Sequence, residues 1–284
     1  MNKAKKVGEK PALNAVIFAF LLVLAMCFLY PLFFILLNSF KGKLFISKNP
    51  FALPTAETFS GISNYVNGIT KTGMLSAVGY SFFITIVSVG LIILFTSMTA
   101  YYITRVHSKV TSTLYYMFVF SMIVPFQMVM FSMVDLADTF HLKNPLGMCV
   151  LYLGFGAGLS VFMFSGFVKS IPLEIEEAAM IDGCTPIQTF FQVVMPIMKP
   201  TCITVAILQA MWIWNDYLLP SLVLDTKKYK TLSIAIQYLK GGYGSVDMGA
   251  MMGVLVISII PIIIFYLACQ KYIIEGVVAG AVKG

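Results

Sequence analysis

Residues 76–104 read SAVGYSFFITIVSVGLIILFTSMTAYYIT, a continuous run without a single charged side chain. A helix needs about 20 apolar residues to cross the hydrocarbon core of a bilayer, and this run is longer. Its apolar residues do not alternate with polar ones, as they would in a barrel strand. Because backbone groups in lipid must pair within the segment, the run predicts a membrane-spanning helix.

Five further windows of the chain have the same character. All six contain one charged residue between them, Asp216, although the chain has 19 basic and 12 acidic residues. Apolar residues make up 59% of the sequence and charged residues 11%, against about 25% charged in ordinary soluble domains. We therefore expect an all-α, polytopic membrane protein, a single transmembrane domain over residues 1–284. Its six spans are expected at about 12–38, 76–104, 110–134, 145–168, 201–224 and 248–270.

The first window follows Lys3, Lys5, Lys6 and Lys10, a pattern that a secretory signal peptide also shows. The apolar core of a cleavable signal is about 7–15 residues long. Here the run continues to Phe40, which favours an uncleaved first span. An even number of spans puts both termini on one side, and the early lysines favour the cytoplasmic side. The basic residues of the remaining loops are nearly balanced between the two sides and decide little.

Several kinds of chemistry are missing from the sequence. The net charge of +7 is spread over every loop, so it indicates anionic lipid headgroups rather than nucleic acid. No P-loop motif occurs, so ATP hydrolysis by this chain is not expected. The five cysteines form no C-x-x-C pair, and the two histidines, His107 and His141, fall in different loops. We expect no catalytic residues, no metal site and no directly bound cofactor.

The most organised loop is residues 170–199, SIPLEIEEAAMIDGCTPIQTFFQVVMPIMK. Pro172 suits the first turn of a helix, and the acids after it suit the positive end of the helix dipole. Gly183 offers the left-handed conformation that ends a helix. Thr185 and Gln188 then form a capping-box pattern that starts a second helix. The pattern predicts two helices joined by a sharp turn outside the membrane, which we call the elbow.

The acidic start of the elbow favours a protein partner over a lipid surface. Glu174, Glu176 and Glu177 follow one another closely, whereas helices that lie on membranes are usually rich in Lys and Arg. Small alanines beside the acids allow another protein to approach closely. Docking to a partner is therefore favoured over an interfacial helix.

Three motifs resemble a known family. Glu177-Ala178-Ala179, Gly183 and Val193-x-Met195-Pro196 resemble the EAA signature of importer-type ABC transporter permeases, with Val and Met in place of the usual Ile and Leu. The stretches WNDYLLP at 214–220 and GAVKG at 280–284 resemble the carbohydrate-uptake branch, in particular its maltose-type second permease. The resemblance extends over essentially the whole chain.

The resemblance implies a permease subunit that moves a sugar, expected to be an oligosaccharide, into the cytoplasm by alternating access. It implies a heterodimer with a second, different permease, two ABC ATPase subunits that bind ATP and Mg²⁺, and an extracellular or periplasmic solute-binding protein. The expected location is the bacterial cytoplasmic membrane. Permeases for glycerol phosphate share these motifs, so another small solute stays an alternative. A secondary transporter is less favoured, because the sequence shows no internal repeat and one ionisable residue in its spans.

The resemblance also assigns expected roles to residues. Coupling to the ATPase is expected of Glu177, Ala178, Ala179, Asp182, Gly183 and Pro196. Contact with the binding protein is expected of the loop 225–247, at Tyr238, Gly241, Gly242, Tyr243 and Gly244. Polar groups at membrane depth are candidates for the solute path, because sugar hydroxyls need partners that donate and accept hydrogen bonds. These candidates are Asn215, Asp216 and Gln127.

Overall fold

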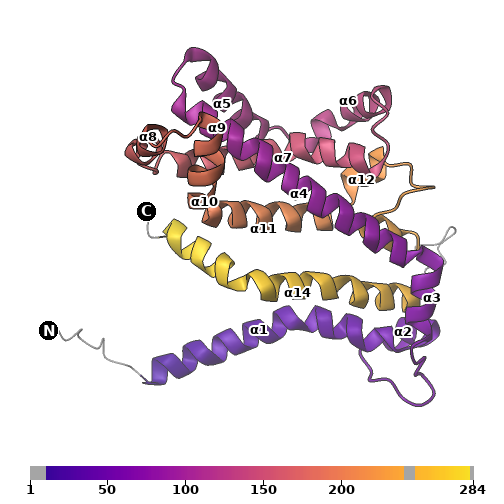
Figure 1. Cartoon of the computed structure of the whole chain (residues 1–284). Coiled ribbons are helices and arrows are strands. Elements are labelled where there is room, and N and C mark those ends of the chain that lie inside the picture. Colours follow the sequence, from indigo (N-terminus) through magenta and orange to yellow (C-terminus); the bar gives the residue numbers. More distant parts are fainter. Residues whose placement is uncertain (1–10, 240–246, 282–284) are drawn as a thin grey trace. The chain divides into compact units, whose positions relative to one another are not determined.

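The computed structural model describes residues 11–239 and 247–281, and the side chains of residues 13–239 and 247–272. Helices dominate the described part, which confirms the all-α prediction; one isolated antiparallel bridge joins Lys41 and Phe59. Figure 1 labels all of the following elements except η1 and α13. They are α1 (Pro11–Ser39), α2 (Lys43–Lys48), α3 (Ser63–Thr72), α4 (Met74–Arg105), α5 (Lys109–Ser121), α6 (Phe126–Thr139), α7 (Pro145–Val168), α8 (Leu173–Ile181), α9 (Pro186–Thr189), π-helix η1 (Phe190–Val194), α10 (Met195–Ile197), α11 (Lys199–Asn215), α12 (Leu218–Val223), α13 (Leu232–Gln237) and α14 (Met248–Ala281).

Four helices of the described part are long and apolar enough to cross a membrane: α1, α4, α7 and α14. Two bent pairs raise the number to six if each pair counts as one span. In one pair, α5 and α6 meet at 107°; in the other, the segment Pro186–Ile197 meets α11 at 75°. At 1.5 Å per residue, the 32 residues of α4 form a helix that is longer than the hydrocarbon core is thick.

Two of the expected spans are not single helices. Within 110–134, the chain breaks between α5 and α6, and Pro125 is extended at φ −63° and ψ 135°. Proline disfavours helical conformation in the residue before it, so a proline inside an apolar run can end a helix that hydropathy alone would continue. Within 201–224, α11 ends at Asn215 and Asp216 is extended at ψ 128° before α12 begins. Asp216 Oδ1 accepts hydrogen bonds from the backbone N–H of Leu218, at 2.9 Å, and of Leu219, at 3.4 Å.

The chain divides into two compact units. Unit 1 comprises Met1–Thr72 and Leu239–Ile260, and unit 2 comprises Gly73–Tyr238 and Pro261–Gly284. In unit 2, α4 packs along α7, while α11 packs against α4 and α5 against α7. Gly158 makes the α5–α7 approach possible, because a Cβ there would lie 2.6 Å from Ser121 Oγ.

The core of unit 2 is apolar and fully closed to solvent at its centre. Ile92, Val161 and Phe164 lie there without exposed surface. Such close packing transmits small displacements from one helix to the next. The elements at the two ends of α4 and α7 are therefore connected through a rigid helix pair.

In unit 1, polar contacts tie α3 to its neighbours. Asn64 Nδ2 donates to the carbonyls of Ser39 and Lys41, both at 2.8 Å. Ser39 is the last residue of α1, where a helix leaves its carbonyls without intrahelical partners, and Lys41 follows two residues later. The Asn64 side chain is buried, so these bonds fix the start of α3 to the end of α1.

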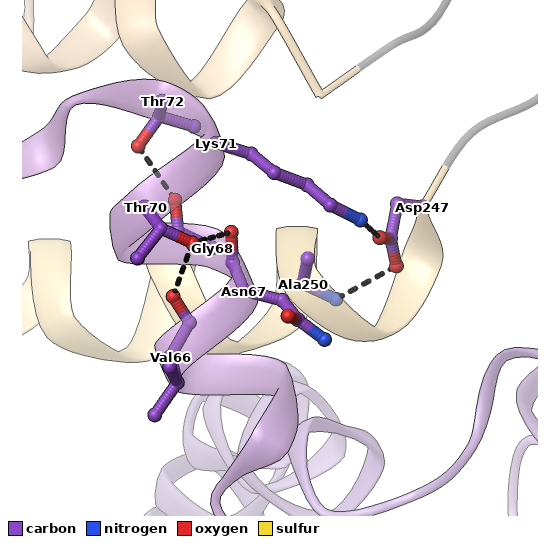
Figure 2. A network of polar contacts seen from close by, with 8 residues as sticks. All are labelled: Val66, Asn67, Gly68, Thr70, Lys71, Thr72, Asp247 and Ala250. Carbon is purple, nitrogen blue, oxygen red and sulfur yellow. Dashed lines mark hydrogen bonds and ion pairs between the residues drawn. The ribbon is translucent and has the colours of Figure 1, made fainter.

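Figure 2 shows the contact between α3 and the start of α14, also within unit 1. Lys71 Nζ lies 2.6 Å from Asp247 Oδ2, and Asp247 Oδ1 accepts from the backbone N–H of Ala250 at 3.2 Å. Asp247 therefore caps α14 and pairs with α3 at once, and the hydrogen bond from Lys71 lowers its pKa. A Cβ at Gly68 would lie 2.5 Å from Val254 Cγ2, so α3 lies directly on α14.

Candidate functional site

The elbow folds as the sequence predicts, into α8, a tight turn and α9. Gly183 has φ +90°, in the left-handed region. Its N–H donates to Met180 O at 3.1 Å, and Cys184 N–H donates to Ala179 O at 3.0 Å. These two bonds form a Schellman motif, which satisfies the last carbonyls of α8 and reverses the chain.

The second helix of the elbow starts with the predicted capping box. Gln188 Oε1 accepts from the N–H of Thr185 at 2.8 Å, and Thr185 Oγ1 accepts from the N–H of Gln188 at 3.4 Å. The chain then widens into η1, where Met195 N–H donates to Phe190 O, five residues back. Pro196 follows immediately and has no N–H to continue an α-helical ladder. The π-helix therefore ends just before the proline of the signature, which lies in the short helix α10 that precedes α11.

A buried ion pair fastens the elbow to α4. Arg105 donates to Glu176 Oε1 from Nε at 2.8 Å and from Nη2 at 2.5 Å, and Tyr101 Oη donates to Glu176 Oε2 at 2.8 Å. Arg105 Nη2 also donates to Ile171 O at 2.9 Å. The Glu176 side chain is 3% exposed and that of Arg105 is 20% exposed. One guanidinium thus holds both the carboxylate of α8 and the backbone that leads into it.

Sequence reasoning missed this pair, because the motif draws attention to Glu177. Two signals could have found it. Arg105 is the only arginine of the chain, and it stands at the very end of a predicted span. Adjacent acids on a helix point about 100° apart, so Glu176 and Glu177 cannot share one environment. The structure accordingly buries Glu176 and exposes Glu177.

The other predicted coupling residues lie on the two sides of α8 and its turn. Ala179 is buried, while Glu177, Ala178, Asp182 and Gly183 are exposed, and Pro196 is exposed further along. Beside them, the tip of the elbow presents large apolar side chains to solvent. Ile181 is 86% exposed and Ile187 is 68% exposed. An exposed apolar tip rimmed by acids is typical of a surface that another protein covers.

Figure 1 places these elements at one end of unit 2. There α8, α9 and α5 gather around the C-terminal end of α4, whereas α6 and α12 lie at the other end. The elbow follows the C-terminal end of α7 along the chain, and Arg105 at the C-terminal end of α4 holds it through Glu176. A displacement of α8 is therefore passed to α4 through the ion pair and to α7 through the chain.

The candidate pathway residues lie in different surroundings. Asp216 is bound on two sides, since Tyr152 Oη donates to its Oδ2 at 2.9 Å and its Oδ1 caps α12. Asn215 lines an apolar cavity of about 480 Å³, and its Nδ2 donates to Met211 O at 2.7 Å. Gln127 is exposed in the first turn of α6. The three do not form one site in the described part of the chain.

Of the predicted binding-protein contacts, only Tyr238 is described. It is 50% exposed, and Lys230 Nζ lies 4.0 Å from the centre of its ring. Gly241, Gly242, Tyr243 and Gly244 lie outside the described residues. No group of three His, Cys, Asp or Glu side chains that could hold a metal occurs among the residues that the structure describes.

Residues 92–278, which include the elbow and most of unit 2, match the family described as binding-protein-dependent transport system inner membrane component. The chain belongs to this family. It is an inner-membrane transport component and not an enzyme, which confirms the prediction made from the EAA signature. The match begins in the middle of α4, so Arg105 and Glu176 both lie within it.

Relatives of this permease match nearly its whole length. It is 38% identical over 262 residues to the "Probable starch degradation products transport system permease protein AmyC" of Thermoanaerobacterium thermosulfurigenes, covering 92% of this chain and 94% of that one. It is 33% identical over 262 residues to the "Multiple sugar-binding transport system permease protein MsmG" of Streptococcus mutans, covering 90% and 92%. It is 30% identical over 268 residues to the "Arabinooligosaccharides transport system permease protein AraQ" of Halalkalibacterium halodurans, covering 94% of each.

A solved structure has the same fold. One chain of a bacterial ABC transporter involved in the import of the acidic polysaccharide alginate superposes with a TM-score of 0.80. The alignment covers 95% of this permease and 99% of that chain, at 21% sequence identity. The predicted importer-permease fold is thereby confirmed.

Proposed function

We propose that this permease imports a sugar, and specifically an oligosaccharide, as one membrane subunit of an ABC importer. One observation carries the proposal: three relatives that match at least nine-tenths of the chain at 30–38% identity are named for starch degradation products, multiple sugars and arabinooligosaccharides. All three names refer to sugars, and two of them, those for starch degradation products and arabinooligosaccharides, favour chains of sugar units. Glycerol phosphate, the other substrate class considered, is favoured by no feature of the described residues.

The assembly proposed is the one that the EAA signature implies. A second, different permease pairs with this one, two ATPase subunits bind ATP and Mg²⁺, and an external solute-binding protein delivers the sugar. Both termini and the elbow then face the cytoplasm of a bacterial cell. The exposed apolar tip at Ile181 and Ile187, flanked by Glu177 and Asp182, supports a protein partner at the elbow.

The proposed mechanism uses the elbow as a lever between the ATPase and the spans. ATP binding on the partner subunits moves the elbow, and the elbow biases an equilibrium between inward-open and outward-open arrangements. The pair of Arg105 and Glu176 supports this role, because a buried, doubly hydrogen-bonded contact resists sliding of α8 against α4. Gly183 supplies the turn that presents the tip.

The solute path and the binding-protein contacts remain part of the proposal. Asn215 is the favoured path residue, because it lines a cavity large enough for part of a sugar. Asp216 is proposed to fix the break between α11 and α12 through Tyr152. Gln127 and the loop around Tyr238 are proposed to contact solute and binding protein, respectively.

The test is reconstitution of the complete transporter in liposomes, with ATP inside and the cognate binding protein and radiolabelled solute outside. The binding protein is first screened by thermal shift against maltooligosaccharides, arabinooligosaccharides, raffinose-type sugars and glycerol 3-phosphate. The proposal expects ATP-dependent uptake of an oligosaccharide that stabilises the binding protein. Stabilisation and uptake of glycerol 3-phosphate alone would overturn the substrate class and leave the importer assignment standing.

A further inference from the structure

A polar cavity of about 250 Å³ lies in unit 2 where the C-terminal ends of α4 and α7 meet the first turns of α5. It is separate from the ion pair of the elbow, since neither Arg105 nor Glu176 lines it. Its polar lining is Thr104, His107, Thr111, Ser112, Tyr115, Tyr116, Ser165 and Lys169.

Two side chains in the wall of this cavity are buried and lack hydrogen-bond partners. Ser165 is 1% exposed and Thr104 is 8% exposed, and neither hydroxyl bonds to any described residue. Other buried hydroxyls of these helices divide into two groups: Ser160 donates to Gly156 O at 2.8 Å, whereas Thr85 and Ser88 also lack a partner among the described residues. Thr104 and Ser165 differ from the last two in that both line the same polar cavity. Leaving a buried hydroxyl unpaired costs about 1–3 kcal/mol, so the two unpaired groups point to a polar ligand that satisfies them.

The positive charge in the lining of the cavity favours an anion as the ligand. Lys169 Nζ lies 5.3 Å from the centre of the Tyr115 ring, and the His107 imidazole lines the same space. No carboxylate is among the described residues of the lining.

The cavity lies where lipid headgroups lie, which favours a headgroup as the source of that anion. Thr104 is the last residue of the span predicted at 76–104, and Lys169 follows the span at 145–168, so the cavity lies at the edge of the hydrocarbon core. Further along α5, Met117 and Phe120 are exposed and offer an apolar track for an acyl chain. Basic pockets between spans at this depth are a recurring form of headgroup site.

We propose that this cavity binds the phosphodiester of an anionic phospholipid in the leaflet that borders the elbow. The ammonium of Lys169 offsets the phosphate charge, and hydroxyl groups of α4, α5 and α7 donate to its oxygens. Because α7 leads into the elbow and α4 holds it through Arg105, a bound lipid stabilises the end of unit 2 from which the elbow projects. The site would make the stability of the transporter depend on anionic lipid.

The test uses the complete transporter in detergent after residual lipid has been removed. Its thermal midpoint is followed while phosphatidylglycerol, phosphatidylcholine or inorganic phosphate is added. The proposal expects phosphatidylglycerol to raise the midpoint and the other two to leave it unchanged. A rise with inorganic phosphate equal to that with phosphatidylglycerol would overturn the lipid source, and an equal rise with phosphatidylcholine would overturn the anion site.

Variants locate the effect. Lys169→Gln is expected to weaken the apparent affinity for phosphatidylglycerol about fivefold, the effect of one basic residue near a membrane surface. The matched control is Lys109→Gln, which removes the same charge from the same surface but does not line the cavity. Ser112→Leu, at an exposed helix position, fills the cavity and should abolish the response. Equal effects of Lys169→Gln and Lys109→Gln, or an unchanged response in Ser112→Leu, would overturn the proposal.

Discussion

Replacing Glu176 with alanine tests whether the elbow is held to α4 by a single buried ion pair. The substitution removes the acceptor of three hydrogen bonds, two from Arg105 and one from Tyr101. Alanine keeps the helix, since it has the highest helix propensity of any residue. The change therefore acts on the attachment of α8 and not on its ability to form.

The expected cost follows from the exposure of the two partners. Removing one member of a buried ion pair costs about 3–5 kcal/mol when the remaining charge stays buried. Arg105 is 20% exposed and keeps its bond to Ile171 O, so water and this carbonyl can replace part of what is lost. We place the cost at about 2–3 kcal/mol, which makes local opening of α8 roughly 30 to 160 times more frequent.

The assay is amide hydrogen exchange of the peptide that covers α8, measured on the complete transporter in lipid nanodiscs, together with ATP-driven uptake in liposomes. Glu176→Ala should accelerate exchange of α8 by that factor and reduce uptake at unchanged expression. Glu174→Ala is the matched control, because it removes an exposed acid from the same helical turn and should cost under about 1 kcal/mol.

A double variant shows whether the attachment of α8 to α4 requires the charges of Arg105 and Glu176 or only a packed contact between the two positions. Arg105→Met combined with Glu176→Met replaces the pair with apolar side chains, which is often neutral for a buried pair. It should restore most of the protection of α8. Equal exchange in Glu176→Ala and Glu174→Ala would refute the reasoning, and so would a double variant that exchanges faster than the single one.

Three further predictions concern other parts of the chain. Gly183→Asp forces a side chain onto φ +90°, at a cost of about 1–2 kcal/mol, and should leave the protein inserted while uncoupling uptake from ATP hydrolysis; normal uptake at normal expression would contradict it. Lys71→Met should lower the thermal stability by less than about 1 kcal/mol at pH 7, and the difference from the wild type should vanish on acidification. The sign follows because Lys71 lowers the folded-state pKa of Asp247 below its ordinary value of 3.8. The contribution of the pair is therefore present above pH 3.8 and is lost as the pH falls through the lowered value; a difference between the variants that does not shrink as the pH is lowered from neutral through 3.8 and below would argue against it. Deletion of 238–244 should impair delivery from the binding protein while assembly, measured by co-purification, stays intact; unchanged uptake would speak against that role.

Local signals in the sequence predicted the elbow well. The turn at Gly183 and the capping box of Thr185 and Gln188 depend on residues within one or two turns of each other, and all were found where expected. Hydropathy located the apolar windows for a similar reason, because lipid imposes the same composition on any span. Composition does not report breaks inside a window, so the extended residues Pro125 and Asp216 were not anticipated.

The ion pair could not be predicted in the same way. Arg105 and Glu176 are 71 residues apart, and their meeting depends on how α4 packs along α7. The signature emphasises Glu177, which is exposed, whereas the neighbouring acid makes the structural contact. The role of Asp216 also changed: the lone charge of the apolar windows caps α12 and accepts a hydrogen bond from Tyr152.

The central claim is that the elbow docks on a separate ATPase, and cross-linking from its tip tests that claim most directly. A photoreactive amino acid replaces Ile181, the most exposed apolar residue of the tip, in the assembled transporter. The matched control places it at Leu146, an exposed apolar residue at the opposite end of α7. The account predicts a cross-link from position 181 to the ATPase whose yield changes with ATP, and none from position 146. An intact, ATP-hydrolysing complex that gives no ATPase cross-link from position 181, or gives one from position 146, would contradict it.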